Sequence, residues 1–205
     1  MTGVKTVRKQ PRQSRSRATV DAILEAAARI LETAGFDALN TNAIAAKAGV
    51  SIGSLYQYFP SRQVIVAELV RRERTALGQA VDGLFERREA LSWAEMRLRL
   101  IRVAVDHQLA RPRLARALEY AEDLLEMDET SGFVLSLDER LVAILAYYKM
   151  PSSLQVAQDL AALVRGIADT AGLRGEEDAD ALALRIGYAV DGYLMGVAAQ
   201  TGAGQ

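Results

Sequence analysis

Residues 41–58 hold two short helical patterns separated by only three residues, and this spacing constrains the fold more than any other feature. The first pattern covers about residues 41–48 and the second about residues 52–58. A turn as short as Gly49-Val50-Ser51 makes two helices cross steeply and pack directly on each other. The spacing therefore predicts a helix-turn-helix.

Single positions in this stretch meet the demands of such a motif. Ala45 is small enough for the helices to approach closely, Gly49 tolerates the positive φ of a tight turn, and Ser51 is placed to cap the second helix. Gly53 and Ser54 are small, so DNA backbone could approach there. The inward positions are apolar: Ile44, Ala48, Val50 and Leu55. The second helix also carries long hydrogen-bonding side chains suited to base edges or phosphates: Tyr56, Gln57 and Tyr58.

The rest of the chain also has helical periodicity, as in Ile23, Leu24, Ala27, Ile30 and Leu31. No strand-like alternation competes with it, and the fold class expected is all-α with about nine helices. The first helix is expected from Thr19, a break at residues 130–132 and a helix end at Gly172. Further helix starts are indicated by capping or first-turn residues at Ser61, Ser92, Pro112, Ser136, Ser152-Ser153 and Asp178. For the helix at Ser136, a start a few residues earlier is the alternative.

Charge divides the chain into two parts. Residues 1–62 contain nine basic and four acidic residues, a net +5, whereas residues 63–205 contain 16 basic and 22 acidic residues, a net −6. Only the front is therefore suited to a polyanion. We expect a flexible basic arm over residues 1–17, a DNA-binding domain over 18–64, and a second helical domain over 65–205, which the family resemblance given below implies to be an effector-binding and dimerisation domain. The arm is equally compatible with DNA contact and with a simple solvated tail.

Composition excludes several kinds of chemistry. The chain has no Cys and a single His, His107, so it lacks a thiol nucleophile, a disulfide framework and the ligands of a Cys or two-His metal site. No nucleophile or phosphate-binding motif converges with the acidic residues of 119–126, so neither a catalytic nor a metal site is expected. The longest apolar run, residues 141–148, is far shorter than a membrane span. We expect a cytoplasmic, non-enzymatic protein that requires no cofactor.

The last two helical patterns differ from the others in composition, most clearly in their small residues. Gly187, Gly192 and Gly196 fall within one helix, where each Gly costs about 1 kcal/mol relative to Ala. Close approach of another helix is one reason to keep them, and packing within the monomer is the alternative. A dimer formed through these two helices would have its interface at Leu160, Val164, Ile167, Gly192 and Gly196.

The middle helices, residues 92–149, would surround any small-molecule cavity. Their apolar and aromatic side chains favour a hydrophobic or amphipathic effector, although each of them is also compatible with plain core packing. The candidate pocket residues are Trp93, Val103, His107, Tyr120, Leu124, Phe133 and Tyr147.

Taken together, residues 41–62 and the upstream pattern at residues 23–36 resemble the TetR-type (tetracycline-repressor) family of bacterial transcription regulators. The resemblance covers about residues 18–70, and the chain has Arg62 where that family often has Lys. It implies a homodimer on a pseudo-palindromic operator in double-stranded DNA, released when a small molecule fills the C-terminal domain. It also implies that Tyr58 and Arg62 bind phosphates and that the remaining contacts come from Thr41, Asn42, Ser51, Ile52, Gly53, Ser54, Tyr56 and Gln57.

Other functions remain open at this point. The same fold serves an activator or a regulator without a ligand. An enzyme with an accessory DNA-binding head would need a catalytic motif that the sequence lacks, and a nucleoid protein would bind DNA without sequence preference. The operator, the target genes and the effector are not encoded in any pattern we recognise.

Overall fold

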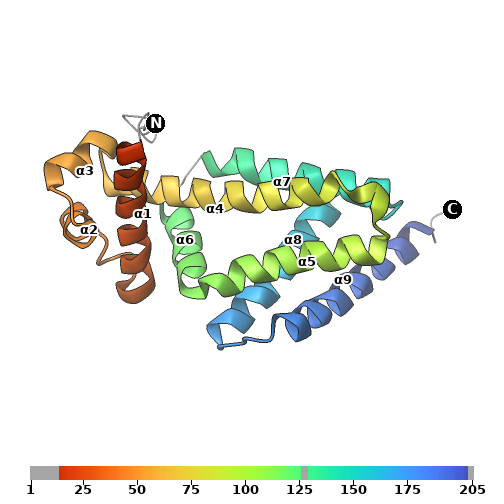
Figure 1. The fold of residues 1–205 in the computed structure, drawn as a ribbon. Coiled ribbons are helices and arrows are strands. Elements are labelled where there is room, and N and C mark those ends of the chain that lie inside the picture. The colour runs from red at the N-terminus through yellow and green to blue at the C-terminus, as the bar shows by residue number, and fades with distance from the viewer. Residues whose placement is uncertain (1–13, 126–128, 203–205) are drawn as a thin grey trace. The chain divides into compact units, whose positions relative to one another are not determined.

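The computed structural model describes residues 14–125 and 129–202, and side chains over residues 16–121 and 137–200. Within these ranges the chain forms nine α-helices and one short 3-10 helix, which confirms the all-α class (Figure 1). The helices are α1 (Ser14–Ala34), α2 (Thr41–Ala48), α3 (Ile52–Tyr58), α4 (Arg62–Phe85), α5 (Trp93–Ala110), α6 (Pro112–Leu125), α7 (Glu129–Tyr147), α8 (Leu154–Leu173) and α9 (Ala179–Gly202), with the 3-10 helix η1 at Arg88–Ala90.

Most helix starts follow the expected capping chemistry. The Ser92 Oγ accepts a hydrogen bond from the Glu95 N–H, and the Glu95 carboxylate accepts one from the Ser92 N–H, which completes the predicted capping box of α5. Ser153 caps α8 and Asp178 accepts from Ala181 N–H at the start of α9. These side chains satisfy backbone donors that have no partner inside the helix.

Two helices are longer than the sequence pattern predicts. Helix α1 begins at Ser14, so residues 14–17 of the expected arm are helical, while residues 1–13 lie outside the described residues. The expected break at residues 130–132 is wrong, because α7 begins at Glu129 and runs through them. A single Gly is tolerated inside a helix at modest cost, so Gly132 is not a strong enough signal to end one.

Residue Gly172 does not end α8 as expected. The helix continues to Leu173, and Gly175, with φ +81°, is the left-handed residue that follows it. A Cβ at Gly172 would lie 3.0 Å from the Pro112 Cβ and 3.2 Å from the Leu109 Cδ2. Gly172 therefore serves close packing rather than a turn.

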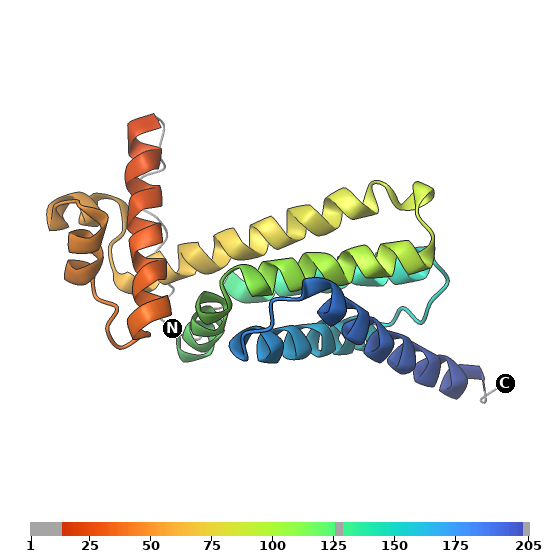
Figure 2. The same ribbon diagram turned by 60° about the horizontal axis from the view of Figure 1, so that its bottom comes forward.

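The chain forms two compact units. The first contains α1, α2, α3, the part of α4 up to Glu73, and α6; the second contains the rest of α4, α5, α7, α8 and α9. The expected boundary near residue 64 differs from this division, because Leu114, Leu118 and Ala121 of α6 belong to the core of the first unit. In the second unit α5, α8 and α9 lie side by side (Figure 2).

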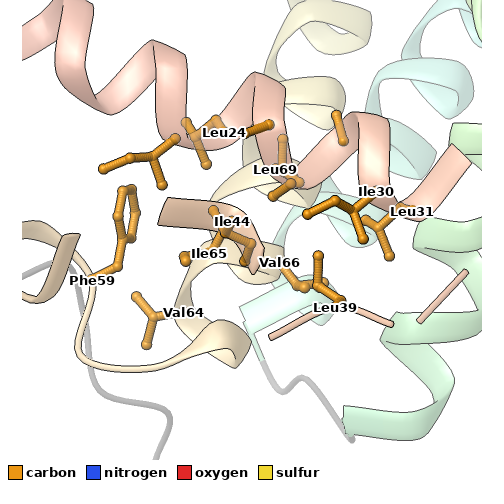
Figure 3. Packing of buried hydrophobic residues seen from close by; sticks show 14 of the residues in the cluster. Leu24, Ile30, Leu31, Leu39, Ile44, Phe59, Val64, Ile65, Val66 and Leu69 are labelled. Carbon is orange, nitrogen blue, oxygen red and sulfur yellow. The ribbon is translucent and has the colours of Figure 1, made fainter. Parts of the chain in front are cut away.

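The core of the first unit holds α2 and α3 in place. Leu24 and Leu31 of α1, Ile44 of α2 and Leu69 of α4 point into one cluster with Phe59 (Figure 3). Burying a side chain of this size contributes about 1.5–3 kcal/mol. The helix-turn-helix is thus built on a scaffold of long helices rather than on its own short ones.

Candidate nucleic-acid interface

The turn between α2 and α3 has the geometry that its residues predict. Gly49 has φ +68°, and the N–H groups of Gly49 and Val50 donate to the carbonyl oxygens of Ala46 and Ala45, at 3.3 and 3.0 Å. The Ser51 Oγ then accepts from Ser54 N–H at 3.1 Å and caps α3. The predicted roles of Gly49 and Ser51 are both confirmed.

A second cap escaped the sequence interpretation. The Asn40 Oδ1 accepts a hydrogen bond of 2.9 Å from Ala43 N–H and so fixes the start of α2. The signal was present, because Asn directly before a helical pattern is among the preferred caps. With both ends of α2 satisfied, the motif is held by local hydrogen bonds as well as by its core.

The inward face of the motif is apolar, as expected. Ile44 and Ala45 of α2 and Leu55 of α3 are buried, and Ala48 and Val50 pack partly buried against the same cluster. This packing fixes which side of α3 faces out. The outward side chains therefore keep one defined orientation.

Most of the predicted DNA contacts lie on this outward side. Ile52 is 38% exposed and Tyr56 is 43% exposed, and Gln57 is also exposed. The Tyr56 hydroxyl and the Thr41 Oγ1 are 3.1 Å apart and share a hydrogen bond that joins α3 to α2. The remaining surface positions of the set are exposed or half-buried: Asn42, Ser51, Gly53 and Ser54.

Two residues of the set also have contacts within the fold. Tyr58 is only 8% exposed and belongs to the core of the first unit. Arg62 donates from Nη1 to the Leu39 carbonyl oxygen at 2.8 Å, and its guanidinium lies 4.9 Å from the centre of the Phe36 ring. Both side chains are thereby held within the first unit rather than extended toward solvent.

A network of charged side chains joins α1 to α4 in the first unit. The nearly buried Glu68 carboxylate accepts hydrogen bonds from Arg71 and Arg72, and Arg72 also donates to Asp21 at 2.6 Å. Burial alone would raise the pKa of Glu68, but the hydrogen bonds from the two guanidinium groups outweigh it and hold the pKa below its ordinary value. This network was not anticipated, since long-range pairing of Asp21 leaves no local signal.

The candidate pocket residues with described side chains come from both units. Tyr120 belongs to the first unit, where its ring meets the Phe36 ring edge-on at 6.5 Å. Trp93 and Tyr147 of the second unit both pack against Tyr148, and Val103 and His107 are half-buried on α5. The side chains of Leu124 and Phe133 lie outside the described residues.

The candidate dimer residues fall into two groups. Leu160 is buried, and Val164 and Ile167 pack partly buried in the core of the second unit. By contrast, Gly192 and Gly196 are exposed, and a Cβ at either would have no neighbour within 4 Å. Packing within the monomer therefore does not account for these two glycines. They share one face of α9 with exposed apolar side chains: Leu184, Tyr188 and Met195.

This face makes α9 unusually apolar for a surface helix. By length and composition alone, residues 179–200 would be able to cross a membrane, but one such helix is weak evidence, and 33% of the window is buried. Across residues 14–125 and 129–202, no group of three or more His, Asp or Glu side chains is placed to hold a metal ion.

The sequence profile of the bacterial regulatory proteins of the tetR family matches residues 23–69, which include α2, the turn and α3. Residues 23–69 therefore form a DNA-binding domain of the tetR type. The chain is a DNA-binding transcriptional regulator, and the proteins of the tetR family are regulators rather than enzymes, are soluble, bind DNA and dimerise.

Solved structures show that the fold extends over most of the chain. A bacterial regulatory protein of the tetR family from Rhodococcus RHA1 has a TM-score of 0.71 at 14% identity, with 86% of this chain and 96% of that chain covered. A TetR-like transcriptional regulator from Rhodococcus sp. RHA1 has a TM-score of 0.65 at 23% identity, covering 87% and 94%. The fatty acid degradation regulator of Bacillus halodurans has a TM-score of 0.65 at 19% identity, covering 89% and 96%. No curated protein matches in the sequence search.

Proposed function

We propose that this tetR-family regulator is a repressor, which binds a pseudo-palindromic operator as a homodimer and leaves it when a small molecule binds the second unit. The observation that carries the proposal is the outward array on α2 and α3. Ile52, Tyr56 and Gln57 face solvent from a helix whose other side is locked into the core. Such a helix is suited to the major groove, and the groove is where base pairs are distinguishable.

The α9 face supports the homodimer. Tyr188 is 66% exposed and Met195 is 73% exposed, and the glycines at positions 192 and 196 leave room for a facing helix. Exposed large apolar side chains on one face of a helix are costly in water and mark an interaction site. A second copy of the same face satisfies two-fold symmetry, which in turn matches a palindromic operator.

Continuity of α4 supports ligand control. This helix begins beside the DNA-binding motif at Arg62, and its residues up to Glu73 belong to the first unit and those from Arg74 to the second. A ligand that favours one conformation of the second unit would thereby change the population of DNA-competent dimers. The effector class we favour is hydrophobic or amphipathic, given the apolar side chains of α5, α7 and α8.

The decisive experiment selects bound genomic fragments and footprints the purified protein on them. A repressor protects one palindrome, and deletion of its gene raises transcription of the neighbouring genes. Broad protection without a shared sequence would instead indicate a nucleoid protein. A fall in transcription on deletion would indicate an activator, and binding that no candidate amphiphile weakens would indicate a ligand-independent regulator.

The dimer has a separate test with a matched control. Tyr188→Glu places a charge on the α9 face and is expected to give monomers by light scattering and to weaken operator binding strongly. Leu98→Glu places the same charge on an exposed apolar position of α5 and is expected to leave the dimer intact. A Tyr188→Glu protein that stays dimeric and binds the operator normally would contradict the proposed interface.

A further inference from the structure

Recognition helix α3 is free of charge, and this limits the bases that it can read. From Gly49 to Ser61 the sequence contains no Arg, Lys, Asp or Glu. The commonest specific contact to guanine is a bidentate one from Arg or Lys, and the contact to the cytosine amino group comes from Asp or Glu. The flanking Arg62 is held by the Leu39 carbonyl and the Phe36 ring. Direct reading of G·C pairs by α3 therefore lacks its usual side chains.

Gln57 has the chemistry and the freedom to read adenine. Its side chain is exposed, and its amide makes no hydrogen bond with any other part of the described structure. An amide offers one donor and one acceptor side by side, which matches the N7 acceptor and N6 donor of adenine in the major groove. Gly53 stands one helical turn earlier on the same face, where it leaves the helix surface free of a side chain.

Ile52 supplies a complementary apolar contact. It opens α3 and keeps 38% of its surface exposed, although a branched apolar side chain gains nothing in water. In the major groove, the only apolar group on a base edge is the thymine methyl. Contact with it would remove the exposed part of Ile52 from water.

Tyr56 differs from Gln57 and Ile52 because it has a hydrogen-bond partner within the protein. Its hydroxyl shares a hydrogen bond with Thr41, so its ring is held against the start of α2. A fixed hydroxyl at the junction of two helices is suited to the sugar–phosphate backbone, which sets register but carries no sequence. Gln57 and Ile52 are left as the readers of base identity.

We propose that the operator half-site is read at A·T base pairs, with Gln57 contacting adenine and Ile52 contacting the thymine methyl. This inference rests on the proposed entry of α3 into the major groove. It goes further by naming the two specificity-determining residues and the bases that they select.

The test uses the full-length protein and the operator found by fragment selection. At each A·T pair of the half-site, adenine is replaced by 7-deazaadenine, which lacks N7, or thymine by uracil, which lacks the methyl group. We expect one 7-deazaadenine position to weaken binding roughly 5- to 150-fold, and one uracil position to weaken it by a smaller factor.

Matched variants assign each loss to its side chain. In Gln57→Ala the 7-deazaadenine effect should disappear while the uracil effect remains, and in Ile52→Ala the reverse should hold. Lys47→Ala, an exposed cation on α2, should weaken all operators alike and reduce the salt dependence. Circular dichroism establishes that each variant is folded.

Three results would overturn the inference. Analogue effects that persist in both variants, a selected half-site read only at G·C pairs, or an equal loss of affinity in Gln57→Ala for every base sequence would each exclude base reading by these residues. Absence of any preferred fragment is a different failure, because it overturns the proposed operator itself.

Discussion

Arg62 and Leu39 are 23 residues apart in sequence, and the Arg62 guanidinium donates a hydrogen bond of 2.8 Å to the Leu39 carbonyl oxygen. The same group lies 4.9 Å from the centre of the Phe36 ring. Arg62 thus ties the start of α4 to the segment that connects α1 and α2. The family resemblance assigns Arg62 to DNA phosphates, and in this structure its guanidinium already has two partners within the protein.

The first prediction concerns this tie. Arg62→Met keeps an unbranched apolar stem but removes the guanidinium donors, and we expect the free energy of unfolding to fall by about 1–2 kcal/mol. Arg29→Met removes only an exposed pair with Glu25 and should cost about 0.5 kcal/mol or less. Urea unfolding followed by circular dichroism measures both. Unchanged stability of Arg62→Met with a large loss of operator affinity would contradict the structural role and favour the phosphate role.

The second prediction concerns the pH dependence of stability. Burial raises the pKa of Glu68, but the hydrogen bonds from Arg71 and Arg72 lower it by more than burial raises it. The folded-state pKa therefore lies below the ordinary value of 4.5. A depressed pKa stabilises the fold fully above about pH 4.5, and this contribution is lost as the pH falls through the folded-state pKa. Glu68→Gln should therefore be less stable than wild type by about 1–2 kcal/mol at pH 7. The difference should shrink below pH 4.5.

Denaturant unfolding at pH 7, 5.5 and 4 follows this difference. Glu25→Gln, which alters an exposed ion pair on α1, is the control and should show a much smaller gap at neutral pH. A gap for Glu68→Gln that is constant with pH, or that widens in acid, would contradict the assigned charge network.

The third prediction concerns the turn of the motif. Gly49 has φ +68° and open space around its Cα, so only the backbone conformation opposes a side chain there. Gly49→Ala should cost about 1–2 kcal/mol. Gly83→Ala, at an equally open position inside α4, should gain up to about 1 kcal/mol because Ala favours the helix. Equal effects of the two substitutions on the unfolding midpoint would exclude a left-handed conformation at Gly49.

Local chemistry explains which parts of this structure were predictable. The caps at Ser51, Ser92 and Ser153 and the turn at Gly49 depend on residues within four positions of each other, and the structure confirms them. Helix type was equally clear, because apolar residues recur with the helical period throughout.

Long-range partners explain what was missed. Tyr58 carries a polar tip and an apolar ring, and only its place in the core cluster of the first unit decides that the ring is buried. The role of Arg62 depends on a carbonyl 23 residues away, and the place of α6 in the first unit depends on Leu114 and Leu118 meeting a distant cluster. These contacts join residues that are far apart in sequence, so no pattern within a short segment predicts them.

The last prediction concerns a buried acid in the second unit. Asp138 of α7 is 2% exposed, and its Oδ2 has no hydrogen-bond partner. A charged carboxylate oxygen that is buried without a hydrogen bond costs more free energy than the neutral amide oxygen of the same shape. Asp138→Asn should therefore raise the free energy of unfolding by about 1–2 kcal/mol. Asp37→Asn, an exposed acid, should leave it unchanged within about 0.5 kcal/mol.

Thermal unfolding of the wild type and both variants at pH 7 tests whether Asp138→Asn stabilises the fold. A natural protein keeps such a cost where the group has another use, since stabilising substitutions often reduce function. A more stable Asp138→Asn protein that no longer responds to its effector would assign the carboxylate to ligand binding. Loss of stability in Asp138→Asn would instead show that the charge has a favourable partner, contrary to its unsatisfied Oδ2.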